Sequence, residues 1–139
     1  MNIKNRIQRL LDIRSSILTK NELELIRTNK DILQKHWKEK NEVCGYIGFN
    51  GKICDVTFRV GDETSVKPEI QTRFARINFH THPAGSYPEP SDYDRKFVFE
   101  QLNERRRWLL CKLKYIVISK NGFYCYGVYS ERFYPWEKL

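Results

Sequence analysis

The sequence predicts a mixed α+β domain in which helices flank a β-sheet. Two helical patterns come first, short apolar runs typical of strands follow, and a third helical pattern interrupts those runs. The predicted order is helix, helix, three strands, helix and two strands, which is an α+β or mixed α/β arrangement. A chain of 139 residues is one domain's worth and can bury a real core without disulfide or metal staples.

A short amphipathic helix opens the chain. Ile3, Ile7 and Leu10 recur at helical spacing, so we expect a helix over residues 3–14. It belongs to an N-terminal extension, residues 1–17. We expect its apolar stripe to dock on the same chain, with docking on a partner as the alternative.

A second helix follows at once. Thr19 and Glu22 have the spacing of a capping box with Thr19 as N-cap, and the apolar spacing continues to about Lys38. His36 lies next to the apolar face of this helix. We interpret it as a packing or surface histidine and not as a ligand.

The middle of the chain changes to strand-like runs. Residues 43–49, 53–60 and 74–79 are short and apolar, whereas 61–72 has the composition of a polar loop. Asn50-Gly51 separates the first two runs. Such a pair predicts a hairpin turn in which both residues take positive φ.

A proline-rich loop and a third helix come next. Residues 83–91 contain three prolines and a glycine, and Ser91 can cap a helix over 92–109. The pattern then closes with a strand over 115–118, a hairpin signal at Asn121-Gly122 and a strand over 123–129.

Composition excludes several classes of protein. Hydrophobic residues make up 40% and charged residues 30%, so the chain is neither disordered nor a membrane protein. No apolar run approaches the roughly 18 residues of a transmembrane helix, and the N-terminus lacks the features of a signal peptide. No cysteines form a CxxC pair, so we expect buried free thiols in a reducing, cytoplasmic compartment. The four are Cys44, Cys54, Cys111 and Cys125.

The chain is basic, with a formal net charge of +8. Nucleic acid or an acidic protein surface would both suit such a charge. The only dense basic cluster, residues 105–107, falls in a helical stretch, and we interpret it as a solvated helix face. No nucleic-acid-binding motif is recognisable, which argues against a nucleic-acid partner.

The residues with the clearest chemistry are His80, His82 and Asp94. Side chains two apart on a strand point to the same side, so both imidazoles can face one point. Asp94 follows the proline-rich loop, which can fold back and bring its carboxylate to the strand end. Two imidazoles and one carboxylate form a three-ligand zinc site with a fourth position open to water. Zinc is favoured by this mixed set, while iron and manganese stay open.

Three segments together resemble the JAMM (MPN+) metalloproteases. They are Glu42-Val43-Cys44-Gly45-Tyr46-Ile47-Gly48, His80-Thr81-His82-Pro83 and Ser91-Asp92-Tyr93-Asp94. The resemblance covers roughly residues 18–130, and it implies an MPN-type metalloprotease domain over 18–139. The stretch between His82 and Ser91 is one residue longer than in the most familiar members. The long insertions with which deubiquitinating members grip ubiquitin are missing.

The resemblance also implies a role for each residue. Glu42 would be the general base and acid, and Ser91 would donate a hydrogen bond to the oxyanion of the tetrahedral intermediate. His80, His82 and Asp94 would hold one catalytic zinc ion. The implied activity is an isopeptidase or peptidase that removes or processes a ubiquitin-like modifier.

Two other functions stay open. A non-catalytic MPN scaffold is one, although such modules usually lack one or more of the five positions filled here. A nucleic-acid-associated JAMM protein is the other, and it rests on the positive charge. A zinc nucleobase deaminase is set aside, because its P-C-x-x-C and H-x-E motifs are both missing from the sequence.

Overall fold

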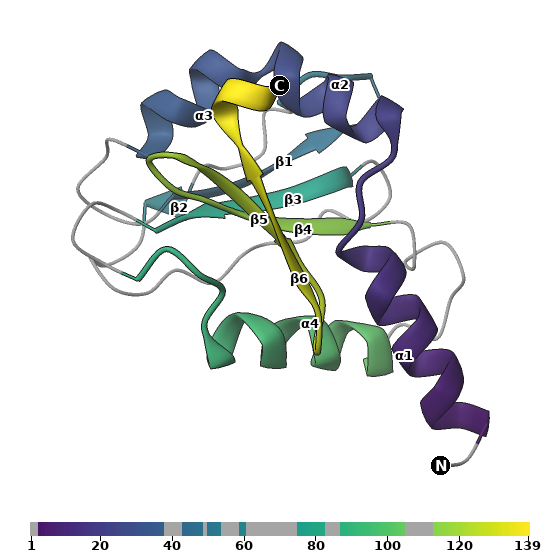
Figure 1. Ribbon diagram of the computed structural model, residues 1–139. Coiled ribbons are helices and arrows are strands. Elements are labelled where there is room, and N and C mark those ends of the chain that lie inside the picture. The colour runs from purple at the N-terminus through teal and green to yellow at the C-terminus, as the bar shows by residue number, and fades with distance from the viewer. Residues whose placement is uncertain are drawn as a thin grey trace.

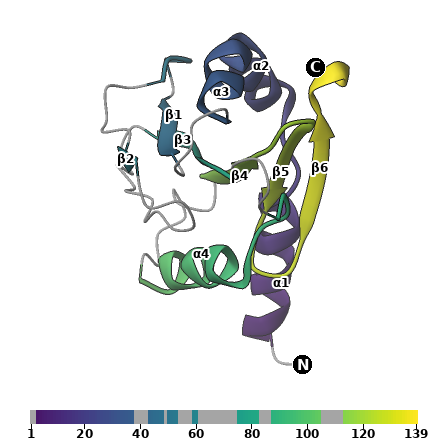
Figure 2. The same cartoon turned by 90° about the vertical axis from the view of Figure 1, so that its left-hand side faces the viewer.

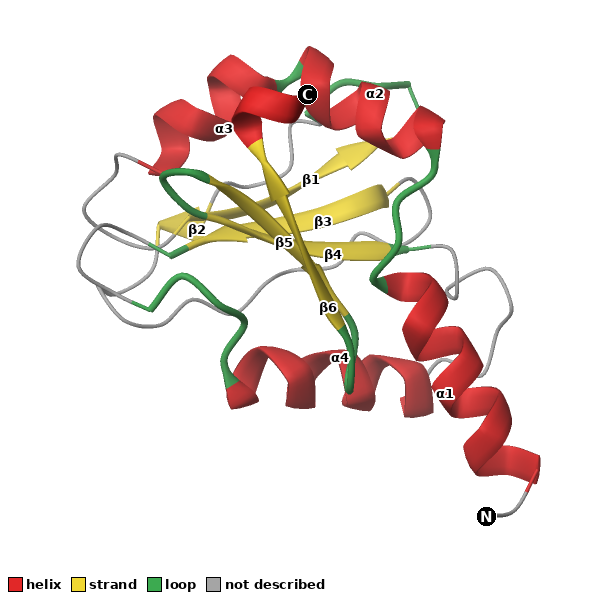
Figure 3. Cartoon of the chain, in the orientation of Figure 1, coloured by secondary structure: helices red, strands yellow, loops and turns green. Residues whose placement is uncertain are grey.

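The computed structural model describes residues 3–37, 43–48, 50–53, 59–60, 75–82, 87–104 and 113–139. In this described part, three helices, three strands, a fourth helix and three more strands follow one another in a mixed α+β domain (Figures 1 and 3), which confirms the predicted fold class. The elements in chain order are α1 (Ile3–Ser15), α2 (Lys20–Thr28), α3 (Lys30–Trp37), β1 (Val43–Gly48), β2 (Arg59–Val60), β3 (Ala75–Thr81), α4 (Asp92–Glu104), β4 (Lys114–Ile118), β5 (Gly122–Tyr126), β6 (Glu131–Pro135) and a 3₁₀ turn, η2 (Trp136–Lys138).

The described strands form one six-stranded sheet in the order β2-β1-β3-β4-β5-β6. β3 and β4 run parallel, and the other neighbours are antiparallel. Because α4 lies between β3 and β4 in the chain, it forms part of the crossover that a parallel pair requires. Figure 2 shows α2 and α3 over one face of the sheet and α4 across the other, with α1 beside β5 and β6.

Side-chain alternation gives the sheet two different buried layers. The layer under α2 and α3 is mostly aliphatic and comprises Leu18, Ile26, Leu33, Ile47, Ile77, Phe79, Ile116, Ile118, Phe123, Cys125 and Trp136. The layer under α4 is richer in tyrosine and comprises Tyr46, Val98, Leu113, Tyr115, Val117 and Tyr126. The α4 side of the sheet therefore has the more polar of the two buried layers.

The helices of the N-terminal region follow the prediction with one exception. α1 is present, and the capping box is confirmed: Thr19 Oγ1 accepts the Glu22 N–H, and Glu22 Oε1 accepts the Thr19 N–H. The expectation of one continuous second helix is wrong, because the helix ends at Asn29 and α3 begins beyond it. The Asn29 side chain donates to the carbonyls of Leu25 and Gly51, 2.8 and 2.7 Å away. The second of these bonds ties Asn29 to backbone outside the helix, which stabilises the break.

The first predicted hairpin turn is present in a different form. Gly51 N–H bonds the Gly48 carbonyl at 3.0 Å, and Gly51 has a φ of 80°. Among the described residues only Gly51 has positive φ, so the expectation for Asn50 is wrong. Asn50 instead accepts the Lys52 N–H through its side-chain oxygen, as in an Asx-turn.

The remaining strands agree with the prediction except at the C-terminus. Of the predicted strand 53–60, Ile53 forms an isolated bridge and residues 59–60 form β2, while residues 54–58 lie outside the described part. The strand predicted over 123–129 ends at Tyr126, and β6 was not predicted. β6 begins with two charged residues, continues with two aromatic ones and is largely exposed, so it lacks the apolar run that marks the other strands. The polar loop 61–72 and the basic cluster 105–107 also lie outside the described residues.

α1 docks on the rest of the chain through polar contacts. The expectation that its apolar stripe docks there is wrong, because Ile3, Ile7 and Leu10 are exposed. Lys114 on β4 donates its ammonium to the carbonyls of Arg14 and Ile17 at the end of α1. His36 stacks on Phe79 with ring centroids 6.3 Å apart, which confirms its interpretation as a packing residue.

Two of the four cysteines fall within the described residues. Cys44 and Cys125 are buried, as predicted, whereas Cys54 and Cys111 lie outside. Burial raises the pKa of the Cys125 thiol to about 12. In the described part of the chain, no helix combines the length and apolar character that a membrane crossing requires.

Candidate metal centre

His80 and His82 lie at the carboxyl end of β3, in the middle of the sheet. Ile77 and Phe79 belong to the aliphatic layer, so the alternate residue His80 points to the α4 side. The His82 N–H bonds the carbonyl of Ile118 at 3.0 Å, which holds the residue after β3 against the end of β4. Both histidines are buried, with 2% and 8% of their surface exposed.

Asp94 reaches the same point from the first turn of α4. The Ser91 hydroxyl oxygen accepts the Asp94 N–H at 3.1 Å, and the Asp94 carboxylate accepts the Ser91 N–H at 2.8 Å. This reciprocal pair is a capping box in which aspartate replaces the usual glutamate. The cap therefore fixes both the start of α4 and the orientation of a 9%-exposed carboxylate.

The three side chains converge on one small volume. The Nε2 atoms of His80 and His82 are 3.3 Å apart, and they lie 3.1 and 3.3 Å from the two oxygens of Asp94. Within the described residues these side chains form one group that could hold a metal ion. Ligand atoms arranged tetrahedrally about 2.0 Å from a metal stand about 3.3 Å apart, so the observed separations suit such a site.

The outer hydrogen bond of His82 also suits metal binding. His82 Nδ1 lies 2.6 Å from the Tyr87 carbonyl oxygen. A carbonyl can only accept, so Nδ1 carries a proton, and Nε2, which faces Asp94 and His80, is the nitrogen left to bind a metal. Ligating histidines are commonly held by such a bond from their other nitrogen. His80 Nδ1 is buried and has no hydrogen-bond partner among the described residues, while the His80 ring meets Tyr126 edge-on.

The negative charge of the Asp94 carboxylate is the main electrostatic feature of this group. Burial raises the pKa of Asp94, but hydrogen bonds with His80 and His82, the charge of His80 and the Ser91 N–H outweigh burial and hold it well below the usual range. Asp94 is therefore a carboxylate at neutral pH. The charge of a buried carboxylate beside two imidazoles must be offset, either by protons on those rings or by a metal ion that takes their place.

The structure brings together most of the residues singled out in the sequence. His80, His82 and Asp94 meet, and Ser91 lies at the same helix start. Glu42 lies outside the described residues. The Tyr87 carbonyl was missed, because a backbone acceptor gives no signal in residue type.

No model of a known protein family matches the chain, and no curated protein matches it either. The site itself defines a buried His-His-Asp group that could hold a metal ion. The metal and the chemistry are matters for proposal.

Proposed function

We propose that the chain is a zinc-dependent metallohydrolase that cleaves an isopeptide or peptide bond, with a ubiquitin-like protein or its conjugate as substrate. The observation that carries this proposal is the convergence of His80, His82 and Asp94 within 3.1–3.3 Å, with the His82 tautomer set by the Tyr87 carbonyl. The mixed nitrogen and oxygen donor set favours zinc. An MPN-type fold is part of the proposal, supported by the JAMM-like motifs and by the mixed sheet with helices on both faces.

When bound, zinc supplies a Lewis acid that polarises a carbonyl and acidifies water toward neutral pH. The buried side chains of His80, His82 and Asp94 would hold the ion. A group that carries protons is also needed, because the leaving amine must be protonated. We assign this role to Glu42. It precedes Cys44 by two positions, and Cys44 pairs with His80 across β1 and β3.

Ser91 suits the role of oxyanion donor. Its oxygen already accepts the Asp94 N–H, which leaves the hydroxyl proton available to a substrate atom. Ser91 is exposed, whereas the ligands behind it are buried. A substrate can therefore reach this hydroxyl beside Asp94.

The test uses purified full-length protein and a ubiquitin-like domain joined through its C-terminal carboxylate to a fluorescent lysine peptide. Wild type should cleave this probe, and a zinc chelator should stop the reaction until zinc is restored. Glu42→Ala should slow cleavage by about 10²–10⁴-fold and Ser91→Ala by about 10²–10³-fold. Glu24→Ala is the matched control, because Glu24 is an exposed glutamate on α2 whose side chain pairs, among the described residues, only with the exposed Arg27.

Two outcomes would reject the proposal. Equal rates for wild type and Glu42→Ala would remove the assigned proton carrier and with it the hydrolase mechanism. Purified protein that binds zinc but leaves every such probe intact would favour a metal-containing scaffold.

A further inference from the structure

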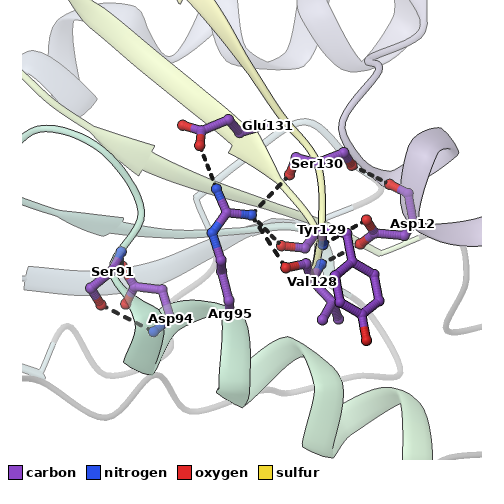
Figure 4. A network of polar contacts seen from close by, with 9 residues as sticks. Asp12, Ser91, Asp94, Arg95, Val128, Tyr129, Ser130 and Glu131 are labelled. Atoms are coloured by element: carbon purple, nitrogen blue, oxygen red, sulfur yellow. Dashed lines mark hydrogen bonds and ion pairs between the residues drawn. The ribbon is translucent and has the colours of Figure 1, made fainter. Parts of the chain in front are cut away.

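A tight turn between β5 and β6 lies between two helices that are distant in sequence (Figure 4). On the α1 side, the Asp12 carboxylate accepts the backbone N–H groups of Val128 and Tyr129. The Asp12 carbonyl accepts the hydroxyl of Ser130 at 2.8 Å. Asp12 is only 1% exposed, so these donors satisfy a buried carboxylate.

The other side of the same turn is held by Arg95 of α4. One guanidinium nitrogen lies 3.1, 3.4 and 3.3 Å from the carbonyl oxygens of Gly127, Val128 and Ser130. The other nitrogen pairs with Glu131 at the start of β6. Backbone N–H groups of the turn thus donate to the Asp12 carboxylate, and its backbone carbonyls accept from the Arg95 guanidinium. We call Asp12, the turn 127–130 and Arg95 the turn clasp.

The turn clasp ends next to the metal centre. Arg95 directly follows Asp94 in the first turn of α4, and its N–H bonds the Ser91 carbonyl at 3.1 Å. The cap at Ser91 fixes where α4 begins, and the clasp fixes how this first turn lies on the sheet. A small rotation of that turn would move the Asp94 carboxylate away from both imidazoles.

We propose that Asp12 and Arg95 are positioning residues of the metal centre, so that α1 sets the place of a metal ligand without touching it. This inference rests on the metal centre of the proposed function, though not on its substrate or its reaction. Loss of an outer partner of a metal ligand typically lowers metal affinity by about 10–100-fold. We expect a change of that size when the clasp is opened.

The experiment measures zinc affinity of the full chain by competition with a chromogenic chelator at neutral pH. Asp12→Asn and Arg95→Gln should each weaken zinc binding by about 10–100-fold. Two variants serve as matched controls. Leu10→Ala changes an exposed side chain on the same helix, and Arg27→Gln removes an exposed arginine from α2. Both should keep wild-type affinity within about twofold.

Two further variants separate positioning from loss of folding. Gly127→Ala opens the clasp without removing a charge, because a Cβ there would collide with the Asp12 carboxylate. Arg95→Lys keeps the charge but loses the planar fork, so its zinc affinity should fall between wild type and Arg95→Gln. Zinc affinity is measured well below the thermal unfolding midpoint of each metal-free variant, where a purely structural role would leave the affinity unchanged.

Folded variants of Asp12 and Arg95 that bind zinc as tightly as wild type would overturn the inference, whatever the enzyme assay shows. If wild type binds no zinc at all, the inference falls together with the metal centre. If wild type binds zinc and the clasp variants bind it weakly, but no probe is cleaved, the positioning role holds and only the proposed hydrolase fails.

Discussion

The first turns of α2 and α4 are capped alike but differ in what faces their carboxylates. At α2, Thr19 and Glu22 exchange the two bonds of a capping box. The second oxygen of Glu22, fully buried, lies 3.5 Å from the Arg76 guanidinium. The charge of this carboxylate is therefore offset by a cation that the chain itself supplies.

At α4 the same device presents its carboxylate to two imidazoles. Ser91 and Asp94 form the cap, and both Asp94 oxygens face Nε2 atoms of His80 and His82. Among the described residues, no arginine or lysine forms an ion pair with Asp94. The cap of α2 thus serves a structural ion pair with Arg76. The cap of α4 instead directs the Asp94 carboxylate toward two histidines, in a group that could hold a metal ion.

The largest expected effect is on zinc affinity and comes from removing the charge of Asp94 in the α4 cap. Asp94→Asn should lower zinc affinity by about a thousandfold, more than the 10–100-fold typical of losing an outer partner. Chelator competition measures this loss. Glu22→Gln is the matched change at α2, and a comparable loss of zinc affinity there would contradict the division of roles.

The next largest effect is on the free energy of unfolding and comes from replacing Glu22 of α2. Glu22→Ala leaves Arg76 without its buried partner and should lower the free energy of unfolding by about 3 kcal/mol, near the low end for a broken buried pair. Urea unfolding of the metal-free protein measures it. Zinc affinity per folded molecule should stay within about twofold of wild type, and a larger fall would link the two caps.

Lowering the pH should reveal how much the Asp94 carboxylate of the α4 cap stabilises the metal-free protein. The pKa of Asp94 is lowered on folding, so its stabilising contribution is present above the ordinary value of 3.8 and is lost as the pH falls. Below about pH 4, wild type should lose up to about 1.4 kcal/mol more per pH unit than Asp94→Asn. Parallel urea series of the two proteins test this, and identical acid limbs would refute it.

The smallest stability effect should be shared by both helices. Thr19→Ala and Ser91→Ala each remove a capping hydroxyl and should lower the free energy of unfolding by about 1 kcal/mol. Thermal unfolding of the metal-free variants compares them. A cost at Ser91 several times that at Thr19 would mean that the α4 cap carries more of the fold than its α2 counterpart.

Sequence alone could predict whatever depends on neighbouring residues. The capping box at Thr19 and the shared face of His80 and His82 follow from fixed spacings in helices and strands. Asp94 was predicted because its carboxylate follows a proline-rich loop into a helix start. These features need no knowledge of the rest of the chain.

Features that depend on distant backbone could not be predicted in this way. Asn29 ends α2 because its side chain finds the Gly51 carbonyl, and Asp12 is buried because a turn more than a hundred positions later supplies its donors. The Tyr87 carbonyl sets the tautomer of His82 without any contribution from the tyrosine ring. In each case the partner is a main-chain group. Every residue offers a main-chain carbonyl, and every residue except proline offers a main-chain N–H, so the residue type gives no signal.

The parallel pairing of β3 with β4 also has a kinetic consequence. To pair these strands the chain must close the whole crossover, yet all three ligands lie at the end of β3 and within the first part of that crossover. Zinc captured early would join Asp94 to the end of β3 and shorten the loop still to be closed by less than half. Loop entropy varies only with the logarithm of length, so zinc present during refolding should speed formation of the sheet by no more than about twofold. Stopped-flow refolding with and without zinc would measure this difference.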